Sequence, residues 1–150
     1  MPSSVDRLVT STGFMLLRVA DLVRDATERA LSEWGLRGKD LRVLALIEGG
    51  ELALSQQDLT ALAGLDRTTM VGVIDLLEER GFARRVRSAT DRRKHVVTVT
   101  DEGRAALGEA LARLDRLEGE FLTTLTPDER AGLNGLVGRV FAAHDPSCMR

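Results

Sequence analysis

Basic side chains are concentrated in one short segment of this chain of 150 residues, whose net charge is −2. Between Arg80 and His95 the only acid is Asp91, and the segment holds seven basic residues: Arg80, Arg84, Arg85, Arg87, Arg92, Arg93 and Lys94. Such a strip on an otherwise acidic chain concentrates a positive field, which attracts the phosphate groups of nucleic acids. A charge run is more often an ordinary solvated face, but these charges bracket a predicted hairpin directly after a pair of helices. We therefore interpret the strip as a phosphate-binding surface.

Residues suited to catalysis or metal binding do not cluster in the sequence. A nucleophilic triad needs a positioned histidine, and the two histidines, His95 and His144, have no glycine-rich elbow or phosphate loop beside them. Two histidines and the single Cys148 also lack the spacing of a zinc site. We expect no enzymatic activity, no metal and no cofactor; an all-carboxylate site is left open, although no pattern points to one.

Size and composition suit a single globular domain over residues 1–150. A lone cysteine allows no intrachain disulfide and fits a reducing cytoplasm. We expect no signal peptide, and no apolar run approaches the ~20 residues of a membrane helix. The chain lacks tyrosine and has few other aromatic residues, which disfavours stacking on single strands or RNA. The predicted partner is therefore double-stranded DNA rather than a membrane.

Hydrophobic spacing and capping residues predict a mainly helical fold with a small β-hairpin. Ser55 begins a capping box, and Asp66, Thr100 and Thr126 are good N-caps for the helices that follow them. The predicted helices cover 5–34, 39–48, 56–64, 67–80, 101–125 and 127–144, and the predicted strands cover 82–86 and 96–99. This order predicts a winged helix-turn-helix lobe over 38–100, flanked by helical regions over 5–34 and 101–144.

Three sequence marks, in this order and spacing, closely resemble the MarR family of bacterial transcription regulators over nearly the whole chain. They are the helix ending LLEERGF, the wing tip Asp91-Arg92-Arg93 and the junction Val99-Thr100-Asp101-Glu102-Gly103. The resemblance implies a homodimer whose first and last two helices interlock. It also implies repression at a pseudo-palindromic operator and, in many members, release by a small aromatic or phenolic ligand.

The expected DNA contacts follow from that arrangement. A recognition helix enters the major groove N-terminus first, which would place Arg67, Thr68 and Thr69 at base edges and phosphates. The two threonines could equally be plain first-turn composition. Val71 and Gly72 share the outward face, where many relatives carry a small polar and then a basic residue. We therefore expect thinner direct base readout from that turn, resting more on Arg67, Thr68 and Thr69.

The wing would supply the remaining DNA contacts. Arg93 matches the family's inserted wing arginine, and Asp91 would either pair with it or brace the loop. A narrow A·T-rich minor groove would attract Arg93 by its shape. We expect phosphate contacts from Arg84, Arg85, Arg87, Arg92 and Lys94, with about half of these side chains facing solvent instead. Ser55 and Gln56 would touch the backbone or simply cap their helix.

Two further sets of residues complete the expected sites. A ligand pocket would be lined by Phe14, Met15, Arg18, Arg42, Leu46, Leu107 and Leu111, although ordinary core and surface roles explain the same residues. The dimer interface would include Leu8, Leu16, Leu133, Leu136, Val137, Val140 and Phe141. Peroxide-sensing relatives carry a cysteine in the first helix, and this chain has none there, which argues against thiol sensing.

Two other classes of function compete with an operator-binding regulator. A winged helix can be a protein-interaction module, but its wing should then expose apolar anchors rather than arginine and lysine. A nonspecific architectural DNA binder would show no preference between a specific and a random duplex.

Overall fold

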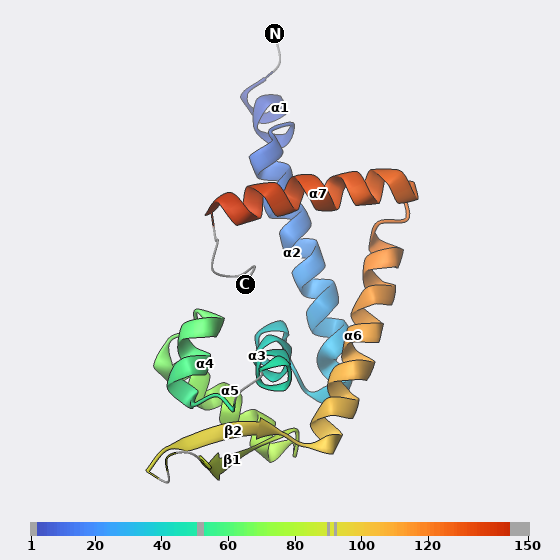
Figure 1. The fold of residues 1–150 in the computed structure, drawn as a ribbon. Coiled ribbons are helices and arrows are strands. Elements are labelled where there is room, and N and C mark those ends of the chain that lie inside the picture. Colours follow the sequence, from blue (N-terminus) through green and yellow to red (C-terminus); the bar gives the residue numbers. More distant parts are fainter. Residues whose placement is uncertain (1–2, 51–52, 90, 92, 145–150) are drawn as a thin grey trace.

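The computed structural model describes residues 3–50, 53–89, 91 and 93–144, and Figure 1 shows two regions. The lower lobe holds three helices and a hairpin, and long helices rise from it as arms. The elements are α1 (Ser4–Val9), α2 (Thr12–Leu31), a 3₁₀ turn (Ser32–Trp34), α3 (Gly38–Gly49), α4 (Gln56–Ala63), α5 (Arg67–Glu79), β1 (Ala83–Arg87), β2 (His95–Val99), α6 (Asp101–Phe121) and α7 (Pro127–His144). The predicted fold class, mainly helical with a small β-hairpin, is confirmed.

The core of the molecule lies in the lobe, where α3, α4 and α5 pack together. Its fully buried side chains include Leu44, Leu59, Met70 and Ile74. The turn between α4 and α5 contains Gly64 at φ +61°, a left-handed conformation that glycine adopts without the cost borne by other residues. Ser55 caps α4 and Asp66 caps α5, as the sequence predicts. The two helices are therefore set in a fixed relative position by local signals.

The hairpin completes the lobe as a two-stranded antiparallel sheet. Its register runs from Ala83 opposite Val99 to Arg87 opposite His95. The Val97 N–H donates to the Leu54 carbonyl at 2.8 Å, which ties the segment before α4 to the outer edge of β2. Strand β1 begins and ends one residue later than predicted, and β2 begins one residue earlier and ends where predicted. The connecting loop is 88–94.

The structure corrects the prediction of one uninterrupted first helix. The helix is interrupted at Thr10 and Ser11. The Thr10 hydroxyl donates to the Asp6 carbonyl at 2.7 Å, and the Ser11 hydroxyl donates to the Leu8 carbonyl at 2.8 Å. The Ser11 side chain then accepts from the Phe14 N–H and caps α2. Hydroxyl side chains that satisfy backbone groups locally compete with helix continuation, and hydrophobic periodicity cannot show this. Gly35, at φ +64°, ends the α2 region as expected.

The lobe is joined tightly to α6. The Thr100 hydroxyl donates to the Gly81 carbonyl at 2.6 Å, and its N–H donates to the Phe82 carbonyl at 3.0 Å. One turn later, a Cβ added at Gly103 would lie 2.0 Å from the Phe82 carbonyl oxygen. Only glycine fits there, because the obstacle is backbone rather than a movable side chain. On the other arm, Glu28 of α2 accepts from the N–H of Gly38 at the start of α3, at 3.2 Å.

We predict that Gly103→Ala lowers the free energy of unfolding by about 1–3 kcal/mol, the usual cost of overpacking a close contact. Urea denaturation followed by circular dichroism measures it. Gly108→Ala is the matched control on the same helix, because a Cβ at Gly108 meets no described atom within 4 Å. The control should gain up to about 1 kcal/mol from helix propensity. Equal stabilities of the two variants would contradict the close approach at Gly103.

Candidate nucleic-acid interface

Helix α5 has one buried and one exposed face. Met70, Val73, Ile74 and Leu77 recur at helical spacing and are buried in the lobe core. Five residues are exposed on the opposite face: Arg67, Thr68, Val71, Gly72 and Asp75. Because the apolar stripe fixes the rotation of the helix about its own axis, these residues point out of the lobe together.

The N-terminus of α5 is held by Asp66. Its carboxylate accepts from the Thr69 N–H at 2.9 Å and from the Thr69 hydroxyl at 2.5 Å. These hydrogen bonds lower the pKa of Asp66 below its ordinary value of 3.8. The Thr69 hydroxyl is thus engaged in the cap, whereas Thr68 beside it is exposed. Of the two threonines, Thr68 has the better position for an outside contact.

The wing loop is braced by Asp91. Its carboxylate accepts from the Arg93 N–H at 3.0 Å and its carbonyl accepts from the Lys94 N–H at 2.9 Å. The Asp91 N–H in turn donates to the Ser88 hydroxyl at 3.2 Å. Of the two roles expected of Asp91, bracing the loop is the one this geometry favours. Arg92, another expected wing residue, lies outside the described residues.

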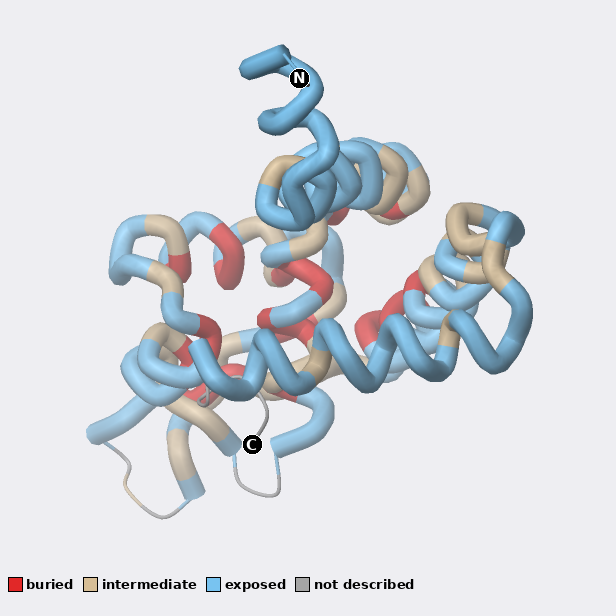
Figure 2. Tube along the Cα trace, turned by 90° about the horizontal axis from the view of Figure 1, so that it is seen from above, coloured by how far each residue is buried: buried red, intermediate tan, exposed pale blue. Residues whose placement is uncertain are grey.

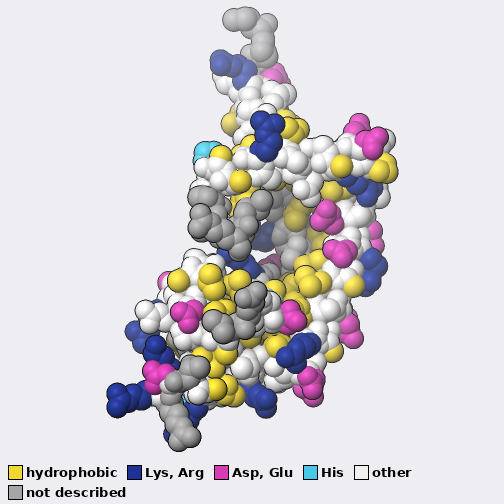
Figure 3. Space-filling model, in the orientation of Figure 1, with side chains coloured by type: hydrophobic (Ala, Val, Ile, Leu, Met, Phe, Trp, Pro, Cys, Tyr) yellow, Lys and Arg dark blue, Asp and Glu magenta, His cyan; other side chains and the backbone are white. Residues whose placement is uncertain are grey.

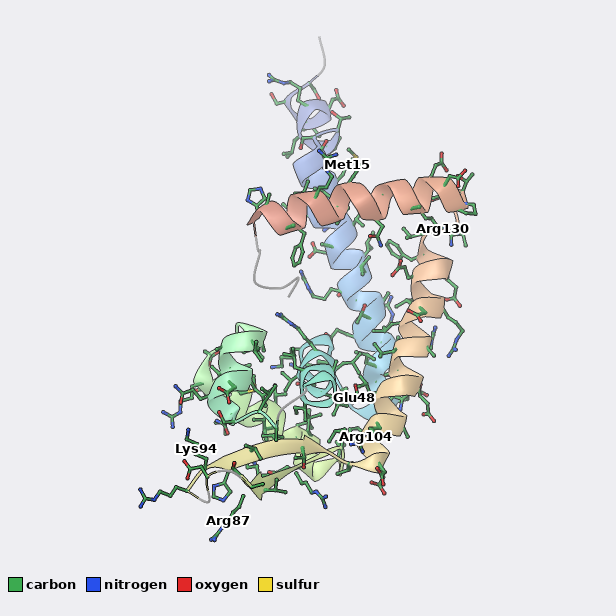
Figure 4. All side chains as sticks on the ribbon, in the orientation of Figure 1. Met15, Glu48, Arg87, Lys94, Arg104 and Arg130 are labelled. Carbon is green, nitrogen blue, oxygen red and sulfur yellow. The ribbon has the colours of Figure 1, made fainter. Side chains whose placement is uncertain are left out.

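Exposed cations surround this loop. Figure 3 shows Lys and Arg side chains gathered over the hairpin at the lower left, and Figure 4 shows Arg87 and Lys94 projecting from it. Arg84 and Arg93 are exposed as well. Arg85 differs, because its guanidinium pairs with Glu78 and, at 2.7 Å, with Asp75 of α5. This pairing braces β1 against α5 and leaves Arg85 poorly placed for the phosphate contact expected from the sequence.

A polar hollow of about 930 Å³ lies between α4, the start of α5 and the hairpin. It brings together four expected contact residues that are far apart in sequence: Ser55, Gln56, Arg67 and Lys94. Ser55 accepts from the Asp58 N–H at 3.2 Å, so capping is one established role for it. His95 and Gln57 also line the hollow. Neither residue was among the contacts expected from the sequence, although His95 directly follows Lys94.

The expected ligand pocket is not assembled within one chain. Leu107 is buried in the lobe core, and Leu46 packs against that core. Figure 4 shows Met15 near the end of α2 that lies level with α7, well away from α3, which carries Arg42 and Leu46. Helical spacing predicts which face of a helix is apolar but not which elements that face meets.

Two apolar hollows, each of about 340 Å³, lie instead along the arms. One, between α2 and α6, is lined by Val19, Val23, Ala26, Thr27, Leu114, Leu117, Glu118, Phe121 and Leu122. The other, between α6 and α7, is lined by Glu118, Leu122, Arg130, Leu133, Asn134, Val137, Gly138 and Phe141. Within the described part of the chain, none of the seven expected ligand-pocket residues lines either hollow.

The arms also leave a large apolar surface uncovered. All residues of α1 and α7 are described, and none of them is buried. The ribbon of α7 crosses α2 in Figure 1, but the view from above in Figure 2 separates the two helices. The expected interface residues are all exposed: Leu8, Leu16, Leu133, Leu136, Val137, Val140 and Phe141. Apolar patches of this kind mark a binding surface.

Comparisons with known proteins agree with this architecture. The sequence profile of the MarR family matches residues 34–94. PecS of Dickeya dadantii (strain 3937), an HTH-type transcriptional regulator, is 28% identical over 127 residues, which are 83% of this chain and 76% of PecS. CouR from Rhodococcus jostii RHA1, solved bound to p-coumaroyl-CoA, is 32% identical with a TM-score of 0.76, over 93% of this chain and 95% of that one. The transcriptional repressor CouR bound to a 23-mer DNA duplex has a TM-score of 0.80 at 27% identity, over 93% and 99% of the chains.

The helix pair, the braced basic wing and the helical arms define a winged helix-turn-helix protein of the regulator type. The chain belongs to the MarR family. Among the described residues, no helix is long and apolar enough to span a membrane.

We predict that Asp66→Asn flattens the loss of stability on acidification. Since the pKa of Asp66 is lowered in the fold, its charge contributes stability above the ordinary value of 3.8, and this is lost as pH falls through the lowered pKa. Asparagine keeps an N-cap oxygen without the charge. Urea unfolding between about pH 6 and pH 3 should therefore show a smaller drop in the variant than in the wild type. Identical drops would contradict the prediction.

Proposed function

We propose that this protein is a homodimeric transcription regulator that acts in the cytoplasm and represses a pseudo-palindromic operator. The observation that carries the proposal is the single surface on which the exposed face of α5, the polar hollow and the basic wing meet. A helix with one free face beside a cationic hairpin fits the major groove and the adjacent backbone of duplex DNA. The DNA-bound structure of CouR supports the same partner.

The contacts divide by chemistry. Arg67 and Thr68 reach base edges in the major groove, where arginine forms a bidentate pair with guanine. Thr69 supports them through the Asp66 cap. Arg93 enters the minor groove, while Arg84, Arg87, Arg92 and Lys94 neutralise phosphates, which positions the protein without reading sequence. Ser55 and Gln56 contribute the N-terminus of α4 to the backbone contact.

A second copy of the chain covers the arms in this proposal. Most helical stability in proteins comes from packing of one face, and α7 buries no residue within the chain. Its Gly132, Gly135 and Gly138 each cost ~1 kcal/mol relative to alanine. A Cβ at any of the three meets no described atom within 4 Å in the single chain. Helix α7 therefore needs a partner surface that approaches closely. Residues 5–34 and 101–144 form this dimerisation region, and 38–100 form the DNA-binding lobe.

A small-molecule effector is part of the same proposal. CouR, which matches 93% of this chain, was solved bound to p-coumaroyl-CoA. That complex supports a small-molecule effector for this protein too. Ligand binding where the arms meet the lobe would change the position of the lobes and release DNA. In a dimer, Phe14, Met15, Arg18 and Leu111 of one chain could approach Arg42 and Leu46 of the other.

Selection of duplexes from a random DNA pool at about 150 mM salt tests the proposed function. We expect one enriched pseudo-palindrome with half-sites about one helical turn apart. Binding without enrichment would indicate a nonspecific architectural protein. A failure to bind any duplex would contradict the proposal and favour a protein-interaction module.

We predict that Leu136→Glu converts the dimer to a monomer. Leu136 is 60% exposed in the single chain, so the substitution removes little internal packing but places a charge in the proposed interface. Sedimentation velocity measures the change. Leu62→Glu on α4 is the matched control, since Leu62 is 52% exposed but lies in the lobe, and it should remain dimeric. A monomeric wild type would overturn the dimer.

A further inference from the structure

The centre of the exposed α5 face has an unusual chemistry for a surface that meets DNA. Val71, which is 37% exposed, and Gly72 stand in the middle of the helix. Neither side chain can donate or accept a hydrogen bond. One turn earlier, Arg67 and Thr68 can do so, and the contrast divides the face into a polar end and an apolar centre.

No packing within the chain explains the glycine. A Cβ added at Gly72 meets no described atom within 4 Å. Gly72 is also absent from the glycines with positive φ, which among the described residues are Gly35, Gly64 and Gly81. Glycine in a helix interior is about 1 kcal/mol less favourable than alanine. Glycine at this position therefore lowers the stability of the helix, and no contact within the described chain offsets that loss.

The next turn of the exposed α5 face, which carries Asp75, adds no side chain free to hydrogen-bond a base. Asp75 would be the acceptor for a cytosine amino group, but its carboxylate is bound by the Arg85 guanidinium at 2.7 Å. That pairing also neutralises an acid that would otherwise repel phosphate. Past Thr68, the described part of the face thus offers only the Val71 methyl groups and the bare backbone at Gly72.

We propose that Val71 reads the 5-methyl group of a thymine in each half-site and that Gly72 lets the helix approach closely enough for this contact. This inference rests on the proposed DNA-binding function and specifies its substrate. In the major groove, the thymine methyl is the apolar group on a base edge, whereas the other edge groups call for hydrogen bonds. Arg67 and Lys94 both line the hollow beside this face. In the proposed complex Arg67 reads a base edge, and Lys94 holds the duplex backbone. An A·T pair beside the Arg67 contact is the sequence class this face selects.

The test replaces thymine with deoxyuridine, one position at a time, in both half-sites of the selected operator. Deoxyuridine removes only the methyl group and keeps base pairing. At one thymine of the half-site, wild-type affinity should fall about fourfold for each methyl group lost, on the scale of one buried carbon. Fluorescence anisotropy at about 150 mM salt measures the dissociation constants.

The Val71→Ala variant shows whether Val71 makes that contact. It should bind the thymine operator more weakly than the wild type does, and deoxyuridine at that position should lower its affinity by less, because the alanine methyl group makes a smaller contact than the valine side chain. Equal losses in both proteins would mean that Val71 does not touch the methyl group and would overturn the assignment. A selected operator at which no deoxyuridine substitution matters would overturn it too. The absence of any selected operator would overturn the proposed function as well, so the two failures are distinguishable.

Gly72→Ala separates a structural role from an approach role. Because the added Cβ has open space, the variant should melt at the same or a higher temperature and yet bind the operator at least tenfold more weakly. Gly108→Ala, another helix glycine with open space, should gain stability and keep wild-type affinity. Unchanged operator affinity in Gly72→Ala would overturn the close approach.

Discussion

The close contact between the first turn of α6 and the backbone at Phe82 is the constraint on which the arrangement of the molecule depends. Gly103 leaves no room between helix and turn, and the Thr100 hydroxyl and N–H fasten the same junction. Helix α5 ends at Glu79, shortly before Phe82. The direction of α5 is therefore set relative to α6 through backbone contacts. Glu28 makes a second attachment, from α2 to the start of α3. The lobe is thus held by both arms.

The sequence predicted what local chemistry decides. Ser55, Asp66 and Thr100 were identified as caps because a capping side chain bonds to backbone within three residues, and all three do so in the structure. The buried and exposed faces of α5 followed from helical spacing. The break at Thr10 and Ser11 was missed, since hydroxyl groups that end one helix and begin the next leave hydrophobic periodicity undisturbed across the junction.

Parts of the site that depend on distant contacts could not be predicted. Arg85 lies in the basic strip and was expected to bind phosphate, and only the fold shows that it pairs with Asp75 and Glu78. The polar hollow joins Gln56 to Lys94 through the packing of α4 against the hairpin. The expected ligand pocket stays a prediction. Periodicity gives the apolar face of a helix but not the surface that faces it, and in the proposed dimer part of that surface comes from the second chain.

On the proposed DNA-binding surface, the charged residues and the exposed face of α5 contribute differently to binding. The cations lie on the wing and around the hollow, where they attract any duplex, and such contacts carry no sequence information. In the proposed complex, selectivity would come from α5, whose exposed face carries the polar side chains of Arg67 and Thr68 before the apolar centre begins. In the proposed dimer, the two lobes would be connected through the arms. Because the contact at Gly103 sets α5 close against α6, an effector that shifted the arms would change the separation of the two lobes without rebuilding the surface of either one.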